Sequence, residues 1–148
     1  MNLLVALLVL AADPVEIKLL PESPGKDAVV KVCLECHGVA NFRKARKDLG
    51  EWSESVDDMV DRGAKATPAE VEAIVAYMVK NFGKDAKVLM NSAPLEEIKV
   101  VLGFSVPEAN AVVAYRDQNG PFKDWRDVLK APGVDPAKVE GKKDAMAF

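Results

Sequence analysis

The chain has 148 residues and is poor in cysteine, histidine and aromatic side chains. It has two cysteines and a single histidine, fewer than the four ligands of a tetrahedral zinc site. It also lacks the βαβ pattern that accompanies a thioredoxin-like pair of cysteines. The net charge is -3, so the chain as a whole is no obvious nucleic-acid binder. These absences exclude a Cys/His zinc domain and argue against a thioredoxin-like protein.

The chain begins with an apolar run, residues 1–12, which is too short to span a bilayer. The run resembles the apolar region of a secretory signal peptide, although the basic region that normally precedes it is missing. A lipid-facing anchor or a buried strand is the alternative interpretation. Export predicts a periplasmic or extracellular (secreted) protein with no membrane span in the mature chain.

A short motif carries the most specific chemistry in the first half. Cys33 and Cys36 are three residues apart, and His37 follows at once, which is the pattern of a c-type haem attachment site. Each thiol would add to one haem vinyl group, and His37 would bind the iron as its proximal ligand. A structural disulfide is the alternative, but it would close a very small loop and stabilise little.

Residues 24–83 predict three or four helices, with no competing strand pattern. In the helix expected over residues 51–62, Met59 shares an apolar face with Trp52 and Val56, so it is predicted to point inward. The alternative is that Met59 is an ordinary core residue. A capping box over residues 67–70 predicts the start of the next helix. The basic cluster of residues 43–47 predicts a docking patch, a partner for haem propionates, or simply a solvated loop.

This half resembles the class I cytochrome c fold. The resemblance is carried by Trp52, Val56 and Met59, followed by the stretches 62–64, 67–70 and 74–78. It implies one covalent haem c, bound by Cys33, Cys36 and His37, with Met59 as the second axial ligand. Met78, Met90 or an open sixth position remain as alternatives for that ligand.

The second half contains an internal repeat of two helical hairpins. Their turns are Gly103-Phe104-Ser105 and Gly133-Val134-Asp135. Residues 91–143 closely resemble the tandem helix-hairpin-helix domain of the bacterial competence-type DNA receptor. The most specific stretches are residues 113–116, 119–122 and 128–133.

In DNA-binding members of that family, each turn has two glycines, whose neighbouring backbone N–H groups hold a phosphate. Here Ser105 and Asp135 replace the second glycine of each turn. Ser105 could still donate to a phosphate, whereas Asp135 would repel it. From Asn91 onward there are eight Lys or Arg and nine Asp or Glu residues. Because neutralised phosphates supply much of the affinity for DNA, the charge favours a protein-docking or structural module over DNA binding.

Together these patterns predict an all-α protein, with a monohaem cytochrome c domain followed by a small tandem helix-hairpin-helix domain. The predicted boundaries are a signal peptide at residues 1–12, the cytochrome domain at 13–88 and the hairpin domain at 89–148. The predicted function is one-electron transfer with a redox partner protein, without enzymatic activity. The alternatives are a haem protein that binds DNA through its hairpins, and a haem sensor or enzyme with an open distal position.

Overall fold

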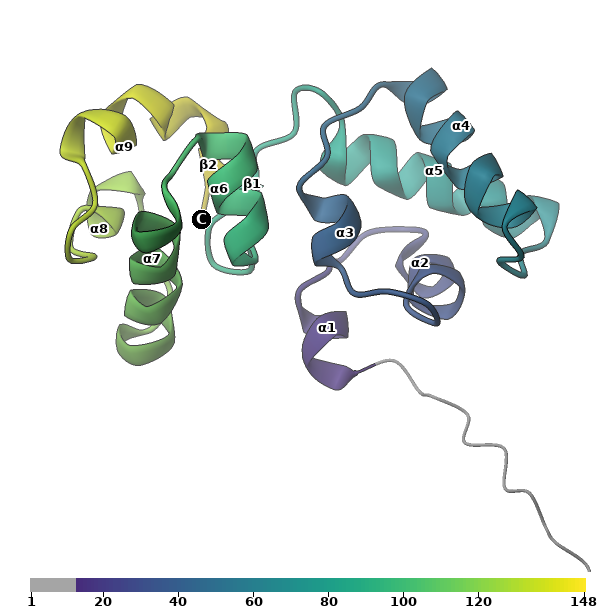
Figure 1. Cartoon of the computed structure of the whole chain (residues 1–148), viewed down its shortest axis with the longest axis horizontal. Helices are drawn as coiled ribbons and strands as arrows, with labels where there is room; N and C mark the ends of the chain where they lie inside the picture. The colour runs from purple at the N-terminus through teal and green to yellow at the C-terminus, as the bar shows by residue number, and fades with distance from the viewer. Residues whose placement is uncertain (1–12) are drawn as a thin grey trace, which may run out of the picture.

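The structure, a computed structural model, describes residues 13–148, so the predicted signal peptide lies outside the described residues. Two groups of helices lie side by side and are joined by the segment that follows α5 (Figure 1). The first group contains α1 (Pro14–Lys18), α2 (Lys26–Cys33), α3 (Ala40–Arg43), α4 (Leu49–Asp61) and α5 (Pro68–Phe82). The second contains α6 (Leu95–Leu102), α7 (Val106–Asn119), α8 (Trp125–Val128), α9 (Pro136–Lys142) and a 3-10 turn (Lys143–Ala145). The prediction of a mostly helical protein is confirmed.

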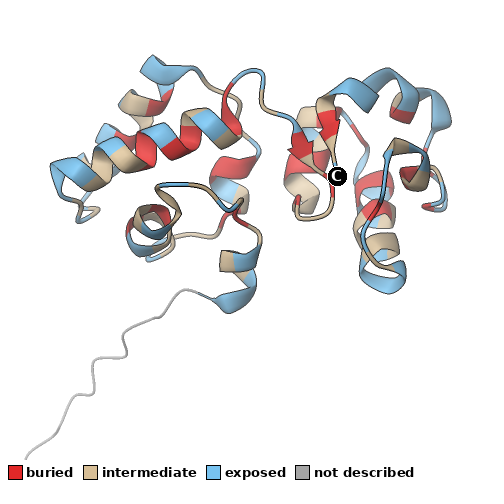
Figure 2. Ribbon diagram, turned by 180° about the vertical axis from the view of Figure 1, so that it is seen from behind, coloured by how far each residue is buried: buried red, intermediate tan, exposed pale blue. Residues whose placement is uncertain are grey.

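The first group is built on α4 and α5, which pack against each other, while α2 crosses α5. Asp48 caps α4 and Thr67 caps α5, each through a complete capping box, which is why the two helices begin where they do. The box at Thr67 was predicted from the sequence. Buried positions recur along α5 (Figure 2). The core of this group consists of Leu20, Val29, Val32, Val39, Phe42, Trp52, Val56, Ile74, Val75, Tyr77, Met78 and Phe82.

The second group has a separate apolar core. It consists of Val88, Met90, Ala93, Ile98, Leu102, Phe104, Ala109, Val112, Phe122, Val128, Ala131, Val134, Val139 and Met146. Two short parallel strands, β1 (Val88–Leu89) and β2 (Met146–Ala147), close this core by pairing Val88 with Met146. The prediction of an all-α protein included no strand. Because two-residue strands leave no periodic pattern, this pairing could not be read from the sequence.

The two groups are joined by a buried charge cluster. Arg43 has no exposed surface, and its Nε lies 2.7 Å from Oε2 of Glu97, which is itself only 1% exposed. Arg46 pairs with the other oxygen of Glu97 at 2.7 Å and donates from Nε to the carbonyl of Ala86 at 3.1 Å. Arg43 also donates to the carbonyl of Ser92 at 2.9 Å. The two arginines of the basic cluster are therefore not part of a solvated loop, because they hold α6 against the first group, whereas Lys44 is exposed and Lys47 lines a cavity of the first group.

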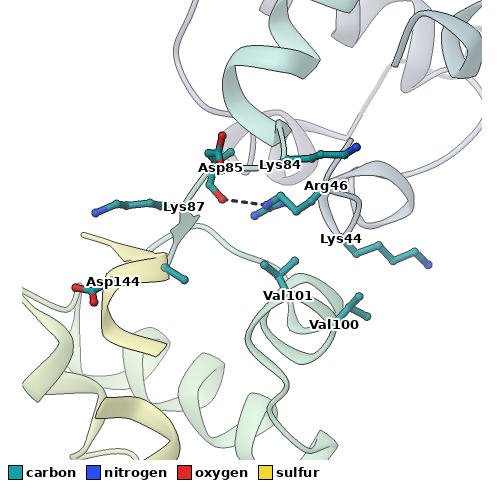
Figure 3. Close-up of a pocket in the computed structure, with 10 residues that line it drawn as sticks. Lys44, Arg46, Lys84, Asp85, Lys87, Val100, Val101 and Asp144 are labelled. Atoms are coloured by element: carbon teal, nitrogen blue, oxygen red, sulfur yellow. Dashed lines mark hydrogen bonds between the residues drawn. The ribbon is translucent and has the colours of Figure 1, made fainter. Parts of the chain in front are cut away.

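A groove runs between the two groups beside this cluster (Figure 3). Its volume is about 730 Å³, and Arg46 lies along one side with its contact to the linker backbone. Lys84, at its edge, is neutralised by Asp48 at 2.7 Å and Glu51 at 3.1 Å. The groove therefore has little net charge despite its lysines. Within residues 13–148, no helix is long and apolar enough to cross a membrane.

Candidate functional site

The first glycine of each hairpin turn has a positive φ of similar size. Gly103 ends α6 with φ +72°, and Gly133 precedes α9 with φ +80°. Both angles lie in the left-handed region that favours glycine, so the glycine is required in each turn. The predicted repeat is therefore present in the structure, with α6 and α7 as the first hairpin and α8 and α9 as the second.

The residues that replace the second glycine cap the following helices. Ser105 caps α7 through its hydroxyl, which accepts from the backbone N–H of Glu108 at 3.4 Å. Asp135 caps α9 by accepting from the N–H of Ala137 at 2.9 Å. Ser and Asp are among the preferred N-cap residues, so both substitutions fit the local fold. The carboxylate of Asp135 nevertheless adds a negative charge at the second turn.

Glu108, which was not among the residues predicted from the sequence, links the two turns. One carboxylate oxygen accepts from the Ser105 N–H at 2.7 Å, and the other accepts from the Asp135 N–H at 3.2 Å. The Ser105 hydroxyl and the Lys138 ammonium also donate to this carboxylate, at 2.7 Å and 2.5 Å. Donation by Lys138, then by Ser105, lowers the pKa of Glu108 to about 2, so the group is charged at neutral pH. The capping-box spacing from Ser105 to Glu108 was the available sequence signal.

Basic side chains on the second group are partly neutralised by their neighbours. Lys130 pairs with Asp127 at 2.6 Å, and Lys99 pairs with Glu96 at 2.7 Å. Lys142 and Lys143, at the end of α9, are exposed and form no ion pair with any described residue. Little of the positive charge of this group is therefore left uncompensated, and part of it lies at the C-terminal end of α9.

The first group contains a cavity of about 530 Å³ that gathers most of the predicted site residues. Cys33, His37 and Met59 line it, together with Met78 and Trp52. Met59 is 39% exposed and lies at the edge of the cavity, so the alternative that it is an ordinary core residue is wrong. The helix carrying it places Val56, one turn earlier, in the same lining.

Two predicted residues lie elsewhere. Cys36 is exposed and is not part of the lining, and Met90 is buried in the core of the second group. Cys33 and Cys36 are free thiols. Burial, followed by the proximity of Cys36, raises the pKa of Cys33 to about 11, which keeps that thiol protonated at neutral pH.

Comparisons with known proteins match the second group of helices. Residues 83–145 match the family model described as "Helix-hairpin-helix motif". ComE operon protein 1 of Bacillus subtilis (strain 168) is 36% identical over 64 residues, 43% of this chain and 31% of that protein. An uncharacterized protein of Haemophilus influenzae is 32% identical over 63 residues, 42% of this chain and 56% of that protein. The chain thus spans only part of these relatives. None of the solved structures matches the chain significantly.

These findings contradict the predicted haem c cofactor and the predicted function in one-electron transfer. The family model and both relatives support the helix-hairpin-helix part, and with it the DNA-binding alternative, whereas none of them supports a cytochrome c domain or a redox partner. Among residues 13–148, no three His, Cys, Asp or Glu side chains form a group that could hold a metal ion. The motif at residues 33–37 was too short a signal to establish the function of the whole chain.

Proposed function

We propose that the helix-hairpin-helix domain binds duplex DNA through its sugar–phosphate backbone. The observation that carries this proposal is the pair of glycine turns, which the bridging carboxylate of Glu108 holds side by side. Backbone N–H groups at helix starts are suited to phosphate oxygens, and a pair of such turns can contact two positions along a strand. Such contacts position the protein without reading bases, so the proposed binding is independent of sequence.

The charges around the turns predict weak binding with a shallow dependence on salt. Ten basic and ten acidic residues lie within the matched segment, residues 83–145. Few cations are therefore available to displace counterions from the phosphates. The wild-type chain is expected to bind a labelled duplex weakly at low salt, with an affinity that falls only modestly at near-physiological salt. Retention of the same affinity at both salt concentrations, or no binding at either, would contradict the proposal.

Substitution of Asp135 by asparagine should tighten this binding about threefold to tenfold, because it removes one negative charge facing the phosphates. Asparagine caps helices as well as aspartate does, so α9 should keep its start. Asp13→Asn is a matched control: Asp13 caps α1 in the same Asp-Pro setting and accepts from Val15 N–H at 2.9 Å. The control should leave the duplex affinity unchanged. Equal effects of the two substitutions would mean that only net charge matters.

We also propose that Cys33, Cys36, His37 and Met59 act together in binding a ligand within the first group of helices. The supporting observation is that three of them line one cavity, where Met78 adds a second thioether. Phe42, Trp52 and Val56 line the same cavity, so the expected ligand is a small apolar molecule rather than a metal ion. An environment-sensitive apolar dye should therefore bind the purified full chain, with an affinity at least severalfold lower in Met59→Asp. Equal affinities of the two proteins for the dye would refute this assignment.

A further inference from the structure

We propose that Glu108 occupies the place of a DNA phosphate between the two hairpin turns and thereby limits the affinity of the domain for DNA. This inference deepens the proposed function and rests on it. Its basis is the set of donors that surrounds this one carboxylate. Two backbone N–H groups, one hydroxyl and one ammonium converge on it, and its side chain is only 7% exposed.

The internal repeat explains why Glu108 can reach both turns. Counted from the residue that replaces the second glycine, Glu108 follows Ser105 by three positions, and Lys138 follows Asp135 by three. The two residues therefore hold equivalent places in the two hairpins, one turn into each helix. Their side chains meet at 2.5 Å across the junction of the hairpins. An acid and a base at equivalent positions thus neutralise each other at the point where the turns converge.

As a consequence, the turns have fewer free hydrogen-bond donors and less positive charge for a phosphate than their backbone conformation suggests. The N–H groups of Ser105 and Asp135 already donate to Glu108, and Lys138, which would otherwise provide a cation beside both turns, is paired with it. A phosphate must displace this carboxylate or bind beside it against its negative charge. Contacts in the wild-type protein should therefore depend more on exposed cations such as Lys142 and Lys143 than on the turn amides.

Glu108→Gln tests the inference directly. Glutamine can still complete a capping box with Ser105, but it carries no charge and releases Lys138. The variant should bind a labelled duplex about tenfold more tightly than the wild-type chain. The slope of log affinity against log salt should steepen by about one, because one more cation faces the phosphates.

Glu70→Gln is a closely matched control in the first group. Glu70 completes the capping box of Thr67 on α5 and pairs with Lys31. This substitution therefore changes the same two kinds of contact at a position far from the hairpins. We expect no change in duplex affinity. A wild-type chain that binds DNA with an affinity equal to that of Glu108→Gln would overturn the inference and leave the proposed function intact. Absence of binding by both proteins at low salt would overturn both.

A measurement on the wild-type chain does not depend on how well the variant folds. The amide resonances of Ser105 and Asp135 should shift little when duplex DNA is added, because their N–H groups are bonded to Glu108. Signals from the end of α9 should shift first. If the two turn amides instead shift first and most strongly, the phosphate has displaced the carboxylate without difficulty, and the inference is wrong.

Discussion

Replacement of Glu97 by glutamine should lower the free energy of unfolding by about 3–5 kcal/mol, because it removes the buried carboxylate that Arg43 and Arg46 both contact at 2.7 Å. Arg43 is fully buried, and burial lowers its pKa while Glu97 opposes that shift. Without the carboxylate, two guanidinium groups would share one largely desolvated site. Chemical denaturation followed by circular dichroism would measure the change.

The neighbouring residue provides the control for this prediction. Glu96 pairs with Lys99 on the surface, where both side chains are more than 30% exposed. Glu96→Gln should therefore change the stability by less than about 0.5 kcal/mol. The chain also has one tryptophan in each half, Trp52 and Trp125, so fluorescence can show which half unfolds first. Similar stabilities for Glu97→Gln and Glu96→Gln would show that the charge cluster does not hold the halves together.

Local signals made much of the fold predictable. Thr67-Pro68 marked the start of α5, and the glycine turns marked both hairpins, because caps and left-handed glycines depend only on nearby residues. Helix boundaries were less accurate, since α4 begins at Leu49 rather than at residue 51. The short helices α1 and α3 carry no periodic pattern of their own and were not predicted.

The contacts between distant segments were not predictable. Arg43 and Glu97 are 54 positions apart, and nothing in either local sequence indicates that they form a buried pair. A basic cluster normally indicates a solvated surface, so its pattern did not predict that Arg43 would be buried. The face that we propose contacts DNA posed a similar problem. The charge of Asp135 was visible in the sequence, whereas the meeting of Glu108 with Lys138 depends on how the two hairpins pack.

Gly25→Ala should destabilise the first group of helices by about 2–5 kcal/mol. Gly25 precedes α2 with φ +94°, a conformation that costs an L-residue about 1–2 kcal/mol. An added methyl group would also lie 3.0 Å from Cβ of Tyr77 and closer still to the carbonyl oxygen of Ala73, both on α5. Because the backbone of α5 cannot yield locally, α2 would have to move away, at a further cost of about 1–3 kcal/mol for overpacking.

Gly63→Ala separates these two contributions. Gly63 has a similar φ of +108°, but an added Cβ there meets no atom within 4 Å. The free energy of unfolding of this control should therefore fall by only about 1–2 kcal/mol, the cost of the left-handed backbone. The difference in unfolding free energy between the two variants then measures the contact between α2 and α5. The fluorescence of Trp52, which donates from its indole to the carbonyl of Phe82 at 3.1 Å, should report the loss in the first group. Equal losses for the two variants would mean that α2 and α5 are not held in close contact at Gly25, and that strain of the backbone alone accounts for the requirement for glycine.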